Sequence, residues 1–341
     1  MIYLMIQTVS LLQHFDLNLG EYKMYKLGID LGGTNIVAGI VDENYNIIAT
    51  AKRKTKCPRP TNEIIDDMAA AALEAIEKSG VNKSEIDAAG VGSPGAIDAV
   101  NGIVCQAYNL GFFNVNIAKM LEEKIGIKFY VENDANAAAY GEFLAGAGKG
   151  TKDFIMITLG TGVGGGIIIN NKIFSSFNYA GGELGHIVIN MNGEMCTCGR
   201  QGCWEAYASA TALIRQTKQA MKRYPNTIIW ELCNGDINSV SGRTSFEAMR
   251  KGDKIAKDVV DRYINYISVG VANIINIFQP EMLCIGGGIS KEGDTLINPI
   301  NDIVQGENFG RNLENKAKIK AAVLGGDAGL IGAAYICNLY K

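Results

Sequence analysis

The stretch Tyr25-Lys26-Leu27-Gly28-Ile29-Asp30-Leu31-Gly32-Gly33-Thr34 decides the fold of this chain. It reads as a buried strand that ends in a glycine turn, and residues 35–41 form the expected return strand. The same unit recurs, with a strand at residues 154–158, the turn Gly160-Thr161-Gly162-Val163-Gly164-Gly165-Gly166 and a return strand at residues 167–169. A unit that occurs at residues 26–41 and again at 154–169 predicts two related halves that face each other.

Around these units, strands alternate with helices. Apolar side chains at helical spacing predict a helix at residues 62–78, and the pair Asn101-Gly102 between extended segments predicts a hairpin turn. Further strands are expected at residues 47–49, 88–92, 129–131 and 282–285, and further helices from 134 to about 146, at 245–252 and 255–278, and from about 328. The alternation predicts an α/β protein.

Length, composition and charge indicate how many domains to expect and which kinds of partner to exclude. A chain of 341 residues with 48% apolar residues suggests two domains. The formal net charge is −3, and Lys and Arg are dispersed, so we expect no nucleic-acid partner. Because no apolar run could span a bilayer and no secretory signal begins the chain, we expect a cytoplasmic protein without a membrane partner. Residues 1–23 do not fit the pattern of the domain that begins at residue 24 and are expected to be a loosely attached extension.

The glycine turns are candidates for phosphate binding. Phosphate oxygens need converging backbone N–H groups, and glycine allows the close approach that side chains would block. Asp30, at the first turn, is placed to hold Mg²⁺ through water. The alternative is a pair of tight hairpins in which glycine serves geometry alone. Two matching turns, with a third at Gly286-Gly287-Gly288, favour the nucleotide interpretation.

Asp134 begins a helix directly after a strand, in Glu132-Asn133-Asp134-Ala135. From this motif alone, the favoured interpretation is a helix N-cap. The alternative is a general base, since the helix dipole would keep such a carboxylate ionised and able to accept a proton from a sugar hydroxyl. The two roles are compatible.

A cluster of metal-ligand types is the strongest local signal. His186, Cys196, Cys198 and Cys203 lie within a short glycine-containing segment and suit tetrahedral zinc, and four protein ligands indicate a structural site. The alternative is a chance group of buried thiols. Glu183 and Glu205 bracket the cluster and could accept hydrogen bonds from sugar hydroxyls, although ordinary surface charge is the simpler interpretation. The other histidine, His14, is expected to be incidental.

Taken in order, these motifs resemble the family named for repressors, open reading frames and kinases (ROK). The resemblance covers nearly everything from residue 25 to the end of the sequence. The motifs that carry it are the turn at 30–34, Ser93-Pro94-Gly95-Ala96-Ile97-Asp98, Glu132-Asn133-Asp134, the turn at 160–166, the segment 183–205 and Asp327-Ala328-Gly329-Leu330-Ile331-Gly332-Ala333-Ala334. The resemblance implies a two-domain, actin-like (ribonuclease H-like) α/β fold of the sugar-kinase type, with an interdomain cleft. A small domain would comprise residues 24–132 plus 325–341, and a large domain residues 133–324 with the zinc loop 183–205.

The resemblance also implies roles for single residues. Asp134 matches the catalytic base for the 6-hydroxyl of a hexose. The matching sugar-binding positions are Gly95, Asn109, Asn133, Asp134, Glu183, His186 and Glu205. The matching nucleotide positions are Asp30, Gly32, Gly33, Thr34, Thr161 and Gly162 for phosphate and metal, and Gly287 and Gly288 for adenosine. His186, Cys196, Cys198 and Cys203 match the zinc ligands.

The implied activity is ATP-dependent phosphorylation of D-glucose with Mg²⁺, since the segments 245–248 and 276–281 resemble the glucokinase branch most. A kinase for fructose, mannose, allose or an N-acetyl amino sugar is the runner-up, and a sugar-sensing regulator or an actin-like ATPase is a further alternative. Polyphosphate remains an alternative donor. Relatives are often dimers or tetramers, which implies a homodimer or homotetramer. The chain departs from the common family pattern at Ala96 and Gly326 and in its N-terminal extension.

Overall fold

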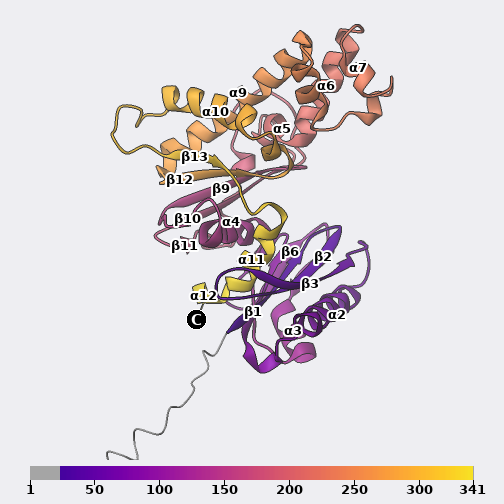
Figure 1. The fold of residues 1–341 in the computed structure, drawn as a ribbon, viewed down its shortest axis with the longest axis vertical. Helices are drawn as coiled ribbons and strands as arrows, with labels where there is room; N and C mark the ends of the chain where they lie inside the picture. The colour runs from indigo at the N-terminus through magenta and orange to yellow at the C-terminus, as the bar shows by residue number, and fades with distance from the viewer. Residues whose placement is uncertain (1–23, 341) are drawn as a thin grey trace, which may run out of the picture.

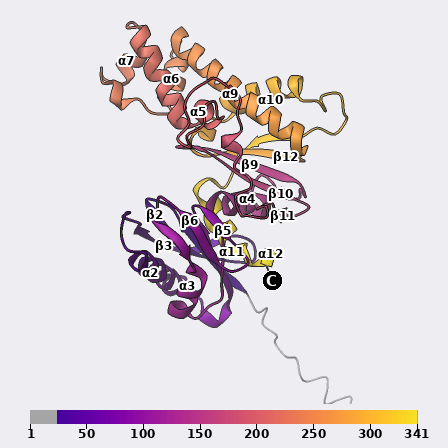
Figure 2. The ribbon, with the colours of Figure 1, turned by 180° about the vertical axis from the view of Figure 1, so that it is seen from behind.

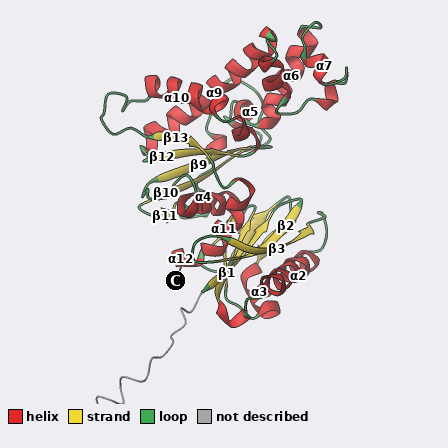
Figure 3. Ribbon diagram, viewed as in Figure 1, coloured by secondary structure: helices red, strands yellow, loops and turns green. Residues whose placement is uncertain are grey.

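The computed structural model describes residues 24–340 (Figure 1). The predicted extension at residues 1–23, with His14, lies outside the described residues. The described chain forms two sheet-containing halves, with helices α4 (Asp134–Ala145) and α11 (Ala328–Tyr335) between them (Figures 1 and 3).

Each half is built on a five-stranded sheet. The first has the order β3-β2-β1-β4-β8, with β1 at Tyr25–Leu31, β2 at Asn35–Val41, β3 at Ile47–Lys54, β4 at Ile86–Ser93 and β8 at Phe129–Asn133. The second has the order β11-β10-β9-β12-β13, with β9 at Phe154–Leu159, β10 at Val163–Ile169, β11 at Lys172–Ile173, β12 at Met282–Gly286 and β13 at Lys318–Ala321.

The two sheets have the same pairing. In both, the first three strands in the chain are antiparallel neighbours, and the last two extend the sheet in parallel from the first strand. β1 therefore corresponds to β9, and the two glycine turns occupy the same place in the two halves. The repeated unit in the sequence is thus a repeat of structure.

Small residues allow α4 and α11 to pack closely against each other. A Cβ atom added to Gly332 would lie 1.7 Å from the carbonyl oxygen of Ala137, and one added to Gly141 would lie 2.1 Å from that of Ala328. Since real Cβ atoms do not approach backbone so closely, larger residues at these positions would force the helices apart. This contact joins the halves, because α4 leads from the first sheet to the second and α11 leads back.

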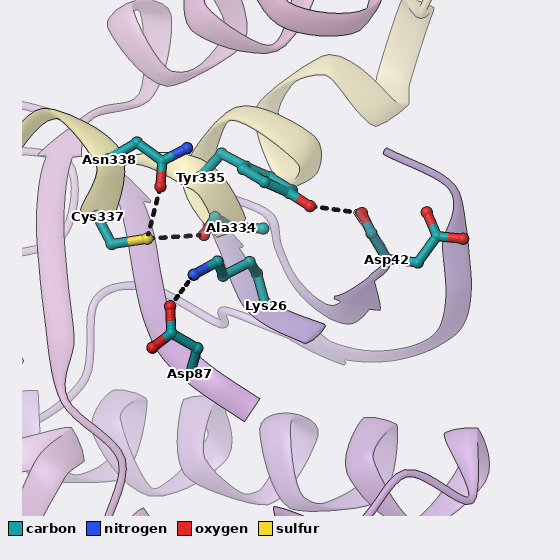
Figure 4. Close-up of polar contacts among 7 residues, drawn as sticks. All are labelled: Lys26, Asp42, Asp87, Ala334, Tyr335, Cys337 and Asn338. Atoms are coloured by element: carbon teal, nitrogen blue, oxygen red, sulfur yellow. Dashed lines mark hydrogen bonds and ion pairs between the residues drawn. The ribbon is translucent and has the colours of Figure 1, made fainter. Parts of the chain in front are cut away.

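The C-terminal helices are held on the first sheet (Figure 4). The Tyr335 hydroxyl donates to the carbonyl oxygen of Asp42 at 2.5 Å, and the Cys337 thiol donates to that of Ala334 at 3.9 Å. Beside them, the ammonium of Lys26 on β1 pairs with the carboxylate of Asp87 on β4. Tyr335 therefore lies against the first sheet, and Tyr340, the last described residue, also bonds to it through Glu132 on β8.

Helices complete both halves, and the first half also has a small sheet (Figures 1 and 2). The first half adds α2 (Thr61–Ser79), α3 (Ile117–Ile125) and the sheet β5-β6-β7, with β5 at Ala96–Asp98, β6 at Ile103–Ala107 and β7 at Phe112–Val115. The second half adds α5 (Glu205–Ala208), α6 (Ala210–Arg223), α7 (Ile229–Leu232), α8 (Thr244–Arg250), α9 (Lys254–Phe278) and α10 (Asp294–Glu307). Short 3₁₀ turns lie at Lys83–Glu85, Leu184–His186, Ile237–Ser239, Gly288–Glu292 and Gly325–Asp327.

The local predictions agree with these elements. The helix expected at 62–78 is α2, those at 245–252 and 255–278 are α8 and α9, and the one from about 328 is α11. The predicted Asn101-Gly102 turn joins β5 to β6, where Asp98 pairs with Ile103. Among residues 24–340, no helix has both the length and the apolar character that a membrane crossing requires.

Candidate active site

The first glycine turn joins β1 to β2. Its own closing bond runs from the Gly32 N–H to the carbonyl oxygen of Asn35 at 2.9 Å. Thr55, which lies just beyond β3 and is fully buried, supplies two more bonds. Its hydroxyl donates to Gly32 O at 2.6 Å, and its N–H donates to Thr34 O at 3.0 Å. The amides of Gly33 and Thr34 have no acceptor within residues 24–340.

The second glycine turn joins β9 to β10 and is one residue tighter, because its closing bond runs from the Gly160 N–H to Gly162 O at 3.0 Å. Here the outside bonds come from the start of α6. The Ala210 N–H donates to Gly160 O at 2.8 Å, and the Thr211 hydroxyl donates to Thr161 O at 2.8 Å. The amides of Thr161 and Gly162 again find no acceptor in the described part of the chain.

The third glycine turn lies beside the second. Gly287 has φ of 85°, and a Cβ atom there would lie 2.5 Å from the carbonyl oxygen of Leu159, the last residue of β9. Glycine is required at this position for both reasons. Gly287 and Gly288 are exposed. The predicted adenosine positions therefore adjoin one of the predicted phosphate turns.

The N-cap of α4 is Asn133, so the interpretation of Asp134 as the cap is wrong. The Asn133 side-chain oxygen accepts from the N–H groups of Ala135 at 2.9 Å and Asn136 at 3.2 Å. Asp134 is the first residue of the helix, and its carboxylate accepts from the Ala135 N–H at 2.9 Å. Asparagine takes the capping role because it immediately precedes the first helical residue, which leaves the carboxylate of Asp134 with oxygens for other partners.

Three carboxylates from different segments interact electrostatically. Burial and then the charge of Asp134 raise the pKa of Asp30 to about 6. Burial is also the main cause that raises the pKa of Asp134; the hydrogen bond from Ala135 opposes it, and the charge of Glu183 adds to it. Burial thus outweighs the stabilisation of the ionised form that we expected from the helix start. Because its pKa is raised, the partly buried carboxylate of Asp134 is suited to accept a proton. The group of three carboxylates is suited to bind a divalent cation.

Two further sugar candidates lie near these groups. The Asn133 amide nitrogen donates to Gly95 O at 3.0 Å. The Asn109 amide nitrogen would lie 3.4 Å from a Cβ atom placed on Gly33. The small sheet thus brings Gly95 and Asn109 to the first glycine turn and to the start of α4.

The metal-ligand types predicted from the sequence come together. The ligand atoms of His186, Cys196, Cys198 and Cys203 all lie within 4.8 Å of one another. The Cys196 Sγ lies 3.6 Å from the His186 Nδ1, and the Cys198 Sγ lies 3.7 Å from the Cys203 Sγ. With Zn–S of about 2.3 Å and Zn–N of about 2.0–2.1 Å, tetrahedral ligands lie about 3.6–3.8 Å apart. The four residues therefore fit zinc in type, and the Cys196–His186 and Cys198–Cys203 pairs also fit it in spacing.

Glu205 links this cluster to the second glycine turn. One carboxylate oxygen, Oε1, lies 3.5 Å from the Cys196 Sγ and accepts from the Thr197 hydroxyl at 3.3 Å. The other, Oε2, accepts from the Val163 N–H at 3.0 Å. A Cβ atom on Gly162 would lie only 2.2 Å from Oε2, so this glycine leaves room for the carboxylate.

Sequence reasoning missed several residues that support these groups. Thr55 and Thr211 are single threonines without a motif of their own, and their spacing from the turns gives no local signal. Glu132 belongs to a predicted motif, but its partners were not predicted. It is buried and accepts from Asn136 at 3.0 Å and from the hydroxyl of Tyr340, at the end of the chain, at 2.6 Å.

Comparison with known proteins finds relatives over nearly the whole chain. The sequence profile of the ROK family matches residues 26–339. Glucokinase of Streptomyces coelicolor is 39% identical over 311 residues, which cover 90% of this chain and 96% of that protein. Glucokinase of Thermotoga maritima is 36% identical over 315 residues, with 92% and 97% covered.

A solved structure extends the likeness to three dimensions. The ROK family glucokinase of Streptomyces griseus, in complex with glucose and AMPPNP, has a TM-score of 0.77 at 38% identity, and the match covers 92% of this chain and 98% of that one. The actin-like α/β sugar-kinase fold expected from the motifs is therefore the fold of this chain. With a profile match over most of its length and relatives above 30% identity, the chain belongs to the ROK family.

Proposed function

We propose that this chain transfers the γ-phosphoryl group of ATP to the 6-hydroxyl of D-glucose. The observation that carries the proposal is the position of Asp134, a partly buried carboxylate interacting with Asp30 and Glu183. It is supported by two glycine turns whose amides have no acceptor among the residues that the structure describes, and by the likeness to proteins named glucokinase.

In this proposal Asp134 is the general base. Its carboxylate accepts the proton of the sugar 6-hydroxyl while that oxygen bonds to the γ-phosphorus and the bond to the β,γ-bridging oxygen breaks, which releases ADP. The raised pKa of Asp134 favours proton acceptance. The other proposed sugar contacts are Gly95, Asn109, Asn133, Glu183, His186 and Glu205. Since the Nδ1 of His186 faces the cysteines, its Nε2 is the atom proposed for a sugar hydroxyl.

The proposed nucleotide contacts come from the glycine turns. The amides without an acceptor in residues 24–340 belong to Gly33, Thr34, Thr161 and Gly162, and Gly32 completes the phosphate set. Gly287 and Gly288, beside β9, are proposed to face adenosine. Asp30 would hold Mg²⁺ through water, and the bound cation would neutralise charge on the phosphates.

The cluster of His186 with the three cysteines is proposed to hold structural zinc. Bound zinc would fix the loop 183–205 that carries Glu183 and Glu205. The division into a small domain, residues 24–132 plus 325–341, and a large domain, residues 133–324, is likewise proposed; it is supported by the chain passing between sheets at α4 and α11. We also propose a cytoplasmic homodimer or homotetramer.

The test is the initial rate of ADP formation from Mg-ATP with a panel of hexoses and N-acetyl amino sugars and a blank without sugar. We expect a clear preference for glucose. A preference for mannose or N-acetylmannosamine would leave the reaction class intact and replace the substrate, and polyphosphate in place of ATP tests the donor. ADP formation that did not depend on sugar would contradict the proposal.

A further inference from the structure

We propose that Thr55 and Thr211 are positioning residues for phosphate binding. Each hydroxyl fixes one peptide of a glycine turn, so that the N–H of that peptide is held ready for a phosphate oxygen. The inference rests on the proposed function, because it assumes that a nucleotide binds at these turns.

Peptide geometry makes the link at the first turn. The peptide between Gly32 and Gly33 is trans and planar, so its C=O and N–H point in opposite directions. The Thr55 hydroxyl holds Gly32 O at 2.6 Å. It therefore also sets the direction of the Gly33 N–H, which points away from Thr55 and has no acceptor within residues 24–340.

The same geometry applies at the second turn. The Thr211 hydroxyl holds Thr161 O at 2.8 Å, and this sets the direction of the Gly162 N–H. The neighbouring bond from the Ala210 N–H to Gly160 O, at 2.8 Å, sets the Thr161 N–H in the same manner. Both amides lack an acceptor in the part of the chain that the structure describes.

A hydroxyl is useful here because glycine peptides rotate easily. Without an anchor on the carbonyl, the peptide could turn its oxygen toward the phosphate, which would repel the anion, and binding would then have to order the turn. Thr55 directly follows strand β3 and Thr211 lies at the start of α6, so two unrelated elements each supply a threonine hydroxyl to a carbonyl of one turn. The two anchored peptides differ in position, because Gly32 O corresponds to Gly160 O, which accepts from the Ala210 N–H.

The experiment replaces each hydroxyl by a methyl group of similar size. Thr55→Val and Thr211→Val are compared with Thr55→Ser and Thr211→Ser, which keep the hydroxyl. Thr151→Val and Thr217→Val are matched controls, because those hydroxyls also donate to carbonyls, of Gly148 at 2.7 Å and Leu213 at 2.8 Å, away from the turns. For each protein we would measure Mg-ADP and glucose affinity by calorimetry, KM and kcat for both substrates, and the melting temperature.

We expect each valine variant to bind Mg-ADP about five- to tenfold more weakly, with KM for ATP raised by a similar factor, because one hydrogen bond is lost. Glucose affinity should stay within about twofold, and the serine variants should recover most of the loss. The positioning role is overturned if the valine variants bind Mg-ADP like the parent, if glucose affinity falls equally, or if serine fails to rescue.

Failure of this inference is distinguishable from failure of the proposed function. If the parent chain binds no Mg-ADP and phosphorylates no sugar, the function fails and the inference fails with it. If the parent binds Mg-ADP and the valine variants bind it equally well, only the positioning role fails. Thr211 is exposed, so its variant tests the second turn even if valine at the buried Thr55 prevents folding.

Discussion

The two glycine turns are equivalent in topology but differ in what surrounds them. The first is held by Thr55, which directly follows β3 of the same sheet, and within residues 24–340 no side chain of the metal cluster bonds to it. The second is held from the start of α6 and by Glu205, whose carboxylate also reaches Cys196. They differ in sequence too, since Asp30-Leu31-Gly32 corresponds to Thr158-Leu159-Gly160.

This difference indicates that the two turns have different roles. The first turn carries the acidic group proposed for Mg²⁺, and its shape depends on local strand pairing. The second turn carries no acid at the corresponding position, and its shape depends on a distant loop with the metal-ligand cluster. The repeated unit thus carries an acid suited to cation binding in one copy and a link to the loop 183–205 in the other.

The largest effect is expected from the carboxylate at the start of α4, which belongs to neither turn. Asp134→Asn should lower kcat by about 10²- to 10⁴-fold, because the general base is lost. Mg-ADP and glucose affinities should change little, since both turns remain. Steady-state rates and calorimetry check this, and turnover like that of the parent would contradict the role of Asp134 as base.

Loss of a metal ligand should affect the second glycine turn more than the first. Cys198→Ala should lower zinc content, raise the glucose KM by about tenfold or more, and weaken Mg-ADP binding through Glu205 and the second turn. Metal analysis and calorimetry would show this, with Cys105→Ala as the control, because Cys105 lies on β6 outside the cluster. A parent protein free of zinc, or unchanged Mg-ADP affinity in a zinc-free variant, would remove the proposed coupling.

The ionised carboxylate of Asp30, at the first turn, should lower the unfolding free energy of the protein. Because the pKa of Asp30 is about 6 in the folded chain, against 3.8 as the ordinary value, the ionised carboxylate destabilises the fold above pH 6. Without Mg²⁺ at pH 8, Asp30→Asn should therefore be more stable than the parent by up to about 3 kcal/mol. The difference should shrink as the pH falls from 6 to below 4. Denaturant unfolding at several pH values measures it, and a less stable variant at pH 8 would exclude this account.

The smallest effect is expected on stability, when one glycine in each turn is replaced by alanine. Gly162→Ala should lower the unfolding free energy by about 1–3 kcal/mol, because its Cβ would meet the Glu205 carboxylate at 2.2 Å. Gly33→Ala should be nearly neutral for stability, since the nearest atom, of the Asn109 side chain, lies at 3.4 Å. Melting temperatures of the two variants test this, and equal losses would show that the turns are not constrained differently.

Much of the fold was predictable because its signals are local. The two strand–glycine turn–strand units, the apolar face of α2 and the Asn101-Gly102 turn all depend on neighbours in sequence. The cap of α4 was predicted wrongly because Asn133 and Asp134 are both good capping residues, and only the position of the first helical turn distinguishes them. The raised pKa of Asp134 also results from burial, which the motif does not encode.

The sequence by itself determined the α/β class, the repeat of the glycine turns, the candidate base and the four metal-ligand types, since each depends on residue type and short spacing. Only the tertiary structure decided that Thr55 and Thr211 hold the turns, that Glu205 connects the cluster to Val163, and that Tyr340 reaches Glu132. These contacts join residues far apart in the chain, and no local pattern specifies which of many threonines or tyrosines the packed sheets and helices will bring to a given carbonyl or carboxylate.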